Sequence, residues 1–453
     1  MSEVLPSGEA RSPGISYQEL LDTDTHEVPD VLRLESPRFL GDEDIPISRY
    51  TTREWHEVEV EKLWSRVWQY ACREEEIPEV GDYYVYDIAK ASYIVMRSAP
   101  DEIKAYPNAC LHRGRRLKDY DGNCSEIRCP FHGHCWEISG ELKDIPASWD
   151  FPHLEERGSD YHLPQIQVGT WAGFVFINPD PNCESLEDFI GDMDSHFEGW
   201  DLANRYKQAH IAKVIDCNWK ISQEAFCEAY HVNATHPNIM LQLGDTNSQI
   251  DIWDNFSRVI TAGATPSPNL DYEVTEEEIL RCAMDTRHDQ DTPMEIPEGS
   301  TARAIAAAGS RERWRQDAGD WVDRLSDAEM MDSIDYTLFP NFHPWGAFNR
   351  IVYRFRPNGD DYRSCIMECI FIAPFIGERP PPAPIHWLEE HETFTDATEL
   401  GMLGKVFNQD LFNMAKVQTG LEATHKPGVS LGNYQESKVR WLHQKLSEWC
   451  EEN

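Results

Sequence analysis

The chain lacks any hydrophobic run long enough to cross a membrane. Its 453 residues contain no stretch of about 18 uncharged apolar residues, the length that a membrane-spanning helix needs. The first 30 residues are polar and acidic and contain no apolar segment typical of a secretory signal peptide. We therefore expect a cytoplasmic protein without a membrane span.

Positive charge is also scarce. The chain has 41 Lys and Arg against 80 Asp and Glu, a formal net charge of −39 at pH 7. A surface of this sign repels a phosphate backbone, which argues against a nucleic-acid-binding protein. One basic cluster interrupts the pattern and consists of Lys104, Arg113, Arg115, Arg116 and Lys118. This cluster is either a solvated loop or a docking surface for an acidic electron-transfer partner.

The 12 cysteines are scattered, without the dense spacing of a small disulfide-rich domain. Two of them alternate with histidines, as Cys110-Leu-His112-Arg-Gly and then Cys129-Pro-Phe-His132-Gly, with sixteen residues between His112 and Cys129. A [2Fe–2S] centre with two imidazoles on one iron takes one Cys and one His from each of two loops. Zinc is the alternative, but common zinc motifs group their cysteines instead of alternating them. The order predicts that the two cysteines hold one iron and the two histidines the other.

A second group of candidate ligands lies between residues 218 and 237. On a helix, Glu228 and His231 would be three residues apart and share one face. His236 follows five residues after His231, about 140° around an ideal helix, so both imidazoles can reach one metal only if the helix loosens. Pro237 makes such a break plausible. The spacing alone is weak evidence, and a purely structural role is the alternative.

These motifs together resemble Rieske non-haem iron (aromatic ring-hydroxylating) oxygenases, large or alpha subunit. The stretch that starts at Asn218-Trp-Lys and ends at His236, and the helix around Asp410, carry the resemblance outside the cluster loops. The resemblance implies that His231, His236 and Asp410 bind a mononuclear iron. Two histidines and one carboxylate leave positions open for O2 and substrate.

The resemblance also assigns a catalytic role to Glu228. It would bridge His231 to His132 of a neighbouring subunit in a head-to-tail trimer, because the two centres of one subunit lie far apart in this family. Two residues depart from the family pattern. Ala225 stands where relatives often have Asn, and Glu228 stands where several have Asp.

The fold class that we expect is α+β: a small all-β Rieske [2Fe–2S] domain and a helix-grip-like catalytic domain with an antiparallel sheet. The expected divisions are an N-terminal arm at 1–50, a helix and the Rieske domain at 51–165, and the mononuclear iron domain at 166–453, with an acidic helical insertion at 265–332. Local patterns predict a helix over residues 52–69 and the first strands of a new domain over 169–178.

The implied function is that of the terminal component of an oxygenase. It would use O2 and electrons from NAD(P)H, delivered by a reductase or ferredoxin, to hydroxylate or dihydroxylate an aromatic or other hydrophobic organic substrate. The implied assembly is a homotrimer, α3 or α3β3 with a small beta subunit. Alternatives are an oxidative O- or N-demethylase of the same family, a Rieske electron-transfer protein with a non-catalytic second site, and a zinc-stabilised binding protein. Candidates for a substrate pocket are Phe226, Ile239, Met240, Leu241, Phe342 and Phe348, although core packing is the expected fate of most of them.

Overall fold

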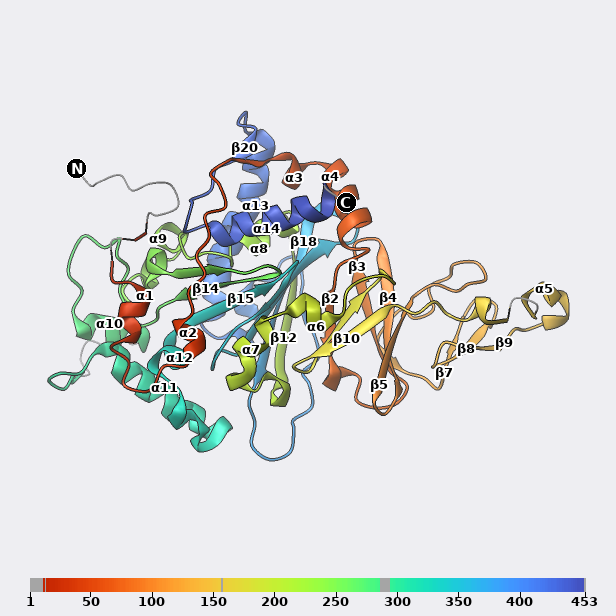
Figure 1. Ribbon diagram of the computed structural model, residues 1–453, viewed down its shortest axis with the longest axis horizontal. Coiled ribbons are helices and arrows are strands. Elements are labelled where there is room, and N and C mark those ends of the chain that lie inside the picture. The colour runs from red at the N-terminus through yellow and green to blue at the C-terminus, as the bar shows by residue number, and fades with distance from the viewer. Residues whose placement is uncertain (1–10, 13, 156–157, 286–293, 452–453) are drawn as a thin grey trace.

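The computed structural model describes residues 11–451 except 13, 156–157 and 286–293. The molecule is elongated, with a larger part in which helices cover a sheet and a smaller part built mainly of strands (Figure 1). Within the described residues, no helix is both long enough and apolar enough to span a membrane.

An eight-stranded sheet forms the centre of the larger part. In spatial order its strands are β13 (Gln249–Ile252), β14 (Phe256–Thr261), β15 (Ser333–Leu338), β16 (Phe342–Pro344), β17 (Ile351–Asn358), β18 (Asp361–Ala373), β12 (Tyr206–Ile215) and β19 (His386–Leu388). Neighbouring strands are antiparallel except β19, which runs parallel to β12. Every residue of β13 and β14 is buried, so both faces of the sheet are covered there.

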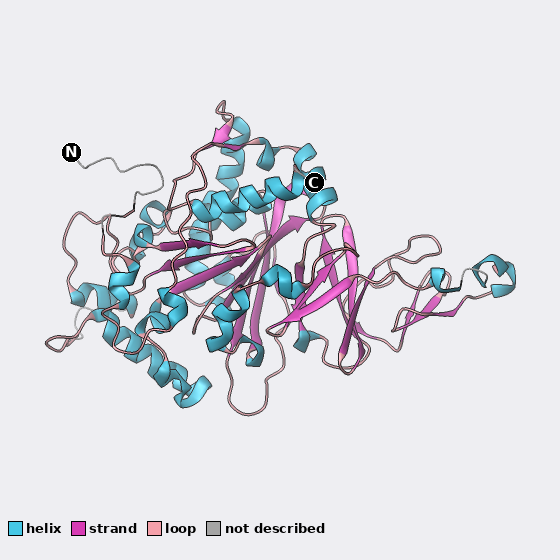
Figure 2. Ribbon diagram, in the orientation of Figure 1, coloured by secondary structure: helices cyan, strands magenta, loops and turns pink. Residues whose placement is uncertain are grey.

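Three helices cover one face of this sheet (Figure 2). They are α8 (Trp219–Glu224), α13 (Leu403–Ala423) and α14 (Ser437–Cys450). α8 packs against β17 and β18, and α14 packs against β13 and β14. Val439, Leu442 and Leu446 are all buried on α14, so this helix turns an apolar face to the sheet.

The smaller part contains two small antiparallel sheets. One consists of β5 (Glu102–Pro107), β4 (Ala91–Ala99), β3 (Asp82–Ile88) and β6 (Gly122–Asn123), and the other of β7 (Glu126–Arg128), β8 (Cys135–Glu137) and β9 (Leu142–Asp144). Ile94, Met96 and Trp136 form a separate hydrophobic core with Cys110 and Cys129. The α+β fold class is therefore confirmed, with a small all-β unit beside a helix-covered antiparallel sheet.

The predicted helix over residues 52–69 is shorter than expected. It begins as predicted, with Thr52 accepting a hydrogen bond from the Trp55 N–H, but α4 ends at Val58 and is followed by a π-helical turn, η1 (Glu59–Leu63). β2 (Gln69–Arg73) then starts. In this π turn the Glu59 carboxylate points inward and accepts a hydrogen bond from Lys220 Nζ at 2.6 Å. Glu59 is thus bound by a residue 161 positions away, a contact that local periodicity does not report.

The strands predicted over residues 169–178 do not open the large sheet. They form β10 (Gln167–Trp171) and β11 (Phe174–Asn178), which make a three-stranded sheet with β2. Phe342 of the large sheet packs against Tyr70 and Phe174, with ring centroids 5.1 and 4.9 Å apart. The three-stranded sheet therefore links the two parts of the molecule.

A buried ion network strengthens this link. Glu368 accepts hydrogen bonds from Arg354 Nε and Nη2, both at 2.7 Å, and from Arg356 Nε at 3.0 Å. Arg354 Nη1 in turn donates to the backbone carbonyls of Tyr70 and Ala71, and Arg356 Nη1 donates to the carbonyl of Asp87. Both arginines therefore reach from the large sheet to the backbone of β2 and β3.

The remaining elements lie around these sheets. They include α1 (Tyr17–Leu21), α2 (Asp30–Arg33), α3 (Ser48–Thr51), α5 (Pro152–Glu155), α6 (Leu186–Ile190), α7 (Met193–Phe197), α9 (Val232–Thr235), α10 (Glu276–Ala283), α11 (Ala302–Ala318), α12 (Asp327–Met331) and the pair β1 (Ile45–Pro46) and β20 (Gly428–Val429). The described part of the N-terminal arm packs against β14, where Arg258 donates to the Val31 and Leu34 carbonyls. The segment 265–332, predicted as a helical insertion, contains α10, α11 and α12 joined by irregular stretches, and its residues 286–293 lie outside the described residues.

Candidate metal centres and substrate cavity

The two loops with alternating Cys and His have the same turn. The Gly114 N–H donates to the Cys110 carbonyl at 2.8 Å, and the Gly133 N–H donates to the Cys129 carbonyl at 3.0 Å. Both glycines have positive φ, 75° and 82°, a conformation that costs glycine little. Each loop thus begins with a thiol and presents an imidazole two or three residues later.

The four side chains divide by burial. Cys110 and Cys129 are only 4% and 2% exposed, whereas His112 is half-buried and His132 is exposed. The two imidazole rings lie 4.7 Å apart between centroids. Burial raises the pKa of the Cys110 thiol, so its thiolate form requires the positive charge of a bound metal. A [2Fe–2S] centre fits this donor set, with its sulfur-ligated iron inside and its imidazole-ligated iron at the surface.

A single zinc ion does not fit these four residues. Metal–ligand distances of about 2.0 to 2.3 Å would place all four ligand atoms within roughly 4 Å of one another. Among the described residues, His231, His236 and Asp410 are the one group of three or more possible ligands whose atoms lie within 4.8 Å of one another. The cluster loops therefore hold their donors farther apart, as two metal ions would require.

The basic cluster beside these loops is largely neutralised. Arg115 pairs with Asp119 at 2.9 Å, and Arg116 pairs with Asp87 at 2.8 Å. Lys104 also lies near a carboxylate, 3.6 Å from Glu102. These ion pairs remove much of the positive charge on which a docking surface for an acidic partner would depend.

The second group of candidate ligands lies after α8. The prediction that Glu228 occupies a helix is wrong, because α8 ends at Glu224 and Glu228 lies in an irregular segment. His231 then begins the single turn α9, and His236 ends it with φ −125° and ψ 50°, directly before Pro237. The predicted break in the helix is confirmed, and it places both imidazoles on one side.

Asp410 of α13 brings the three candidate ligands together. Its Oδ1 lies 2.8 Å from His236 Nε2 and 3.6 Å from His231 Nε2. Three ligands on one side of a metal ion, each about 2.0 to 2.2 Å from it, are roughly 3 Å apart. Two nitrogens and one carboxylate oxygen at these separations suit a non-haem Fe(II) ion with open positions.

Each imidazole is oriented through its other ring nitrogen. His231 Nδ1 lies 2.7 Å from Glu228 Oε1, and His236 Nδ1 lies 2.8 Å from Gln409 Oε1. A proton on each Nδ1 then donates to the oxygen and leaves Nε2 free to bind a metal, as is usual for metal-binding histidines. Gln409 was not among the residues predicted from the sequence. No local signal identifies it, because its role depends on how α13 packs against the loop after α8.

The Asn218-Trp-Lys motif fixes the start of this segment. Asn218 caps α8 and accepts from the Lys220 N–H at 3.1 Å. The Trp219 indole and the Lys220 ammonium both donate to buried Glu59, at 3.1 and 2.6 Å. The motif thus holds α8 in place but contributes no atom to the metal centre.

A cavity of about 370 Å³ adjoins the second centre. The three candidate ligands line it, and so do apolar side chains that include Phe226, Val232, Ile239, Leu243, Val259, Tyr353, Val406 and Phe407. Phe226 and Ile239 were predicted, whereas Met240 and Leu241 do not line it. Phe342 lies in the core between the sheets, and Phe348 packs against Trp314 and Trp321. Cys282 and Ala283 of the insertion also line the cavity, which the sequence did not predict.

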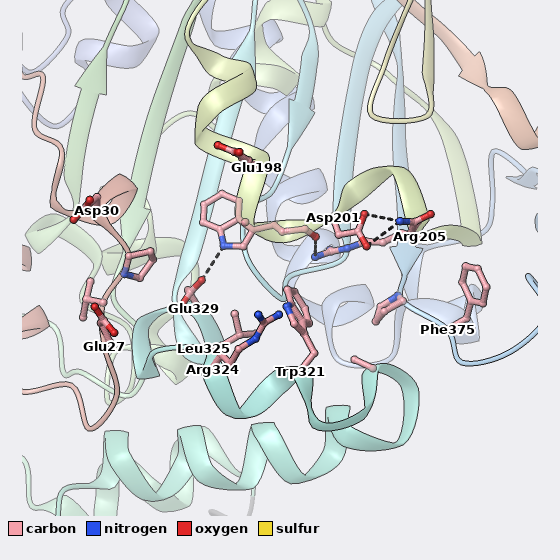
Figure 3. A pocket seen from close by; sticks show the side chains of 17 residues that line it. Glu27, Asp30, Glu198, Asp201, Arg205, Trp321, Arg324, Leu325, Glu329 and Phe375 are labelled. Atoms are coloured by element: carbon pink, nitrogen blue, oxygen red, sulfur yellow. Dashed lines mark hydrogen bonds between the residues drawn. The ribbon is translucent and has the colours of Figure 1, made fainter.

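A larger cavity, of about 900 Å³, lies elsewhere (Figure 3). Glu27, Asp201, Arg205, Trp321 and Glu329 are among its lining residues, and none of the candidate ligands is. Arg205 already donates to backbone carbonyls, and Glu329 already accepts from the Trp200 indole at 2.9 Å. Arg205 and Glu329 therefore serve the fold, and the candidate metal ligands line the smaller cavity.

Two family models match the chain. Residues 197–452 match the family model described as "Ring hydroxylating alpha subunit (catalytic domain)", and residues 67–155 match the "Rieske [2Fe-2S] domain" model. The large subunit of anthranilate 1,2-dioxygenase from Acinetobacter baylyi is 34% identical over 196 residues, which are 42% of this chain and 41% of the relative. The oxygenase subunit of glycine betaine monooxygenase from Pseudomonas aeruginosa is 27% identical over 234 residues, 51% of this chain and 52% of the relative. The chain thus aligns with about half of the length of the curated relatives it matches.

Solved structures have the same fold. Naphthalene 1,2-dioxygenase from a Rhodococcus species, bound to indole, superimposes with a TM-score of 0.60 at 21% identity and covers 90% of this chain and 94% of its own. A quaternary ammonium Rieske monooxygenase gives a TM-score of 0.62 at 16% identity and covers 90% of this chain and 95% of its own.

Proposed function

Because this chain belongs to the family of ring-hydroxylating alpha subunits, we propose that it is the terminal oxygenase component of a Rieske system. It would hydroxylate or dihydroxylate an aromatic or other hydrophobic organic substrate with O2. The observation that carries the proposal is the convergence of His231, His236 and Asp410 on one side of an apolar cavity.

Each residue set has a distinct part in this proposal. Cys110, Cys129 and the paired histidines would hold the [2Fe–2S] cluster, which a reductase or ferredoxin supplies with electrons from NAD(P)H. The three ligands beside the cavity would hold Fe(II), which when bound supplies the O2 activation. Glu228 and Gln409 orient the two imidazoles through their Nδ1 atoms. Phe226, Tyr353 and Phe407 keep water from the substrate and hold it against the open side of the centre.

We infer a trimer, and the separation of the two centres within one chain supports it. They lie in different parts of one chain, since the cluster loops adjoin β7 and β8 whereas α9 and α13 carry the second centre (Figure 1). A second copy of the chain would therefore bring its cluster beside this chain's Glu228. Each of the two regions has an exposed aromatic side chain that could take part in such packing. Phe131 next to His132 is 58% exposed, and Phe412 on α13 is 65% exposed.

The docking place for the second copy would be a small cavity beside Glu228. Its volume is about 220 Å³, and Glu224, Glu228 and Glu436 line it together with apolar side chains such as Val417. Carboxylates accept strong hydrogen bonds from N–H donors, and the N–H of a metal-bound imidazole would be such a donor. Glu228 would thus accept from His231 of its own chain and from His132 of its neighbour.

Product analysis tests the proposed function. The purified holoenzyme, supplied with O2, NADH and a surrogate reductase, should convert members of an aromatic panel to hydroxylated or dihydroxylated products. Asp410→Ala should abolish product and mononuclear iron while the cluster remains reducible. Glu399→Gln, a carboxylate that pairs with His386 at 2.9 Å away from the centre, is the matched control and should keep both. Turnover by Asp410→Ala would refute the assignment, and formaldehyde release without ring hydroxylation would identify a demethylase.

A further inference from the structure

Arg113 is an unpaired cation at the surface beside the cluster loops. Its side chain is exposed and lies over the Phe131 ring, 5.6 Å from the ring centroid, and it forms no ion pair with any residue that the structure describes. Arg115 of the same loop differs, because it pairs with Asp119 at 2.9 Å. Arg113 and Phe131 thus form a positively charged, partly apolar tip next to His132.

The small cavity beside Glu228 has the opposite charge. Three carboxylates line its volume of about 220 Å³, those of Glu224, Glu228 and Glu436, and no Lys or Arg of the described chain lines it. Glu224 Oε1 lies 2.8 Å from His443 Nε2. Burial lowers the pKa of His443, so this imidazole is neutral and does not cancel the charge of Glu224.

The carboxylates in this cavity repel one another. Burial, and after it the charges of Glu228 and Glu224, raise the pKa of the Glu436 carboxyl. Glu436 accepts a hydrogen bond from the Gly432 N–H at 2.6 Å, which adds no positive charge. A cation between the carboxylates would remove the repulsion. The cavity is smaller than the roughly 300 to 1,000 Å³ of typical small-molecule sites, so it suits a single side chain better than a metabolite.

Apolar side chains accompany the charges on both surfaces. Val417 of α13 lines the cavity and is 46% exposed, and Phe412 of the same helix is 65% exposed. Phe131 is 58% exposed beside Arg113. Aromatic residues and arginine are enriched in the cores of protein interfaces, and opposite charges across an interface fix its register. The tip and the cavity therefore complement each other in charge and in apolar surface.

The tip and the cavity of one chain lie apart. The cluster loops adjoin β7 and β8 at one end of the elongated molecule, whereas α13 and α14 lie over the large sheet (Figure 1). Contact between the two surfaces therefore requires a second copy of the chain.

We propose that Arg113 of one copy enters the cavity of the next copy and donates hydrogen bonds to Glu224 and Glu436. The inference rests on the proposed function, because it names the contact by which the second copy docks beside Glu228. A guanidinium group has five N–H donors in a planar fork and can bond two carboxylates at once. Arg113 is thus a positioning residue, and it leaves Glu228 available to His132 of the docked copy.

Sedimentation velocity of the purified holoenzyme over a range of concentrations tests this contact. Arg113→Gln should raise the dissociation constant of the assembly by roughly 30-fold or more, because it removes one partner of a charge pair that docking buries. Arg115→Gln is the matched control. Arg115 lies in the same loop but already pairs with Asp119 at the surface, so its loss should change the constant by a few fold at most.

Exchanging the charges assigns the contact to two residues. Arg113→Glu and Glu436→Arg should each weaken the assembly, and the double variant should restore it to within about tenfold of wild type. Two independent structural defects would not cancel in this way. The Rieske absorption and the iron content show whether each variant is folded. If Glu436→Arg does not fold, Glu436→Gln replaces it, and its effect should then be smaller in the presence of Arg113→Gln than alone.

Oxidation of a pre-reduced cluster in single-turnover kinetics gives a second readout. In dilute Arg113→Gln protein this step should be slow, because the cluster of one copy no longer lies beside the second centre of another. It should recover at high protein concentration, where the assembly forms again. A concentration-independent rate equal to that of wild type would contradict the contact.

Wild-type assembly of Arg113→Gln, or a double charge exchange that does not restore assembly, would overturn the inference. Failure of the proposed function looks different. Assembly that depends on Arg113 without any oxygenated product refutes the oxygenase and keeps the contact. Product formation by a wild-type monomer refutes the contact and keeps the oxygenase.

Discussion

Replacing Gln409 with leucine should weaken mononuclear iron binding without touching any ligand. The Gln409 Oε1 atom lies 2.8 Å from His236 Nδ1, and His236 is only 3% exposed. Leucine has a similar size but no acceptor. The buried Nδ1–H would lose its partner. The tautomer that carries its proton on Nε2 would become more populated, and its Nε2 cannot bind a metal.

The magnitude follows from these contacts. Leaving a buried donor unsatisfied costs about 1 to 3 kcal/mol. Removing an outer partner of a metal-binding histidine typically lowers metal affinity about 10- to 100-fold, which corresponds to about 1.4 to 2.7 kcal/mol. The two free energies agree, so we expect the Fe(II) dissociation constant of Gln409→Leu to rise by about one to two powers of ten.

The assay is anaerobic titration of Fe(II) into protein whose mononuclear iron has been removed by a chelator, with the Rieske absorption as an internal check. Gln409→Glu restores an acceptor and should bind iron within a few fold of wild type. Asn413→Ala is the matched control, because Asn413 lies one turn further on α13 and bonds Thr235 of the same loop at 3.1 Å without contacting an imidazole. Wild-type affinity in Gln409→Leu would refute the orienting role.

Three further outcomes are expected. His112→Cys should remove the normal Rieske absorption and leave mononuclear iron bound, because the two ligand sets are separate; a normal spectrum would contradict the assignment. Glu228→Gln should retain both metals but slow oxidation of a pre-reduced cluster in single-turnover kinetics, since an amide cannot hold the negative charge that stabilises protonated imidazole partners. Glu368→Gln should lower the free energy of unfolding by about 3 to 5 kcal/mol in urea titrations, because it leaves two arginines buried with one acceptor fewer. Glu422→Gln, which breaks a partly exposed pair with Arg363, should cost at most about 1 kcal/mol.

The Glu368 variant should also change the response to acid. Burial alone would raise the pKa of the Glu368 carboxyl, but the charges of Arg354 and Arg356 outweigh it and hold that pKa well below its usual range. The stability that this carboxylate contributes is therefore present above about pH 4.3, its unfolded value, and is lost as the pH falls toward the lower folded value. Glu368→Gln should show a correspondingly weaker loss of stability in acid, and an unchanged profile would contradict the ion network.

Features that depend on residues close together in the sequence could be predicted. The cluster loops are local turns, so Cys110 and His132 could be placed from their neighbours, and Pro237 marked the break after His236. What depends on contacts between distant segments could not be predicted. At Val58 the helix gives way to a π turn whose Glu59 pairs with Lys220, 161 positions away, and Glu228 lies in irregular backbone after α8.

The same limit applies to the residues around the ligands. Gln409 meets His236 across 173 positions of sequence, and this pair has no motif of its own. Adjacent helical residues point about 100° apart, so even the position of Gln409 next to Asp410 did not indicate that both would serve one histidine.

The contacts of Arg354 and Arg356 with β2 and β3 use specific side chains on one side and backbone groups on the other. On the side of the large sheet they depend on three particular side chains, but on the other side the acceptors are the backbone carbonyls of Tyr70, Ala71 and Asp87. Any amino acid supplies a backbone carbonyl. The smaller part can therefore change its sequence at these positions, or be exchanged for a homologous unit in a chimera, and keep the attachment, whereas the large sheet cannot exchange Arg354 or Glu368 alone.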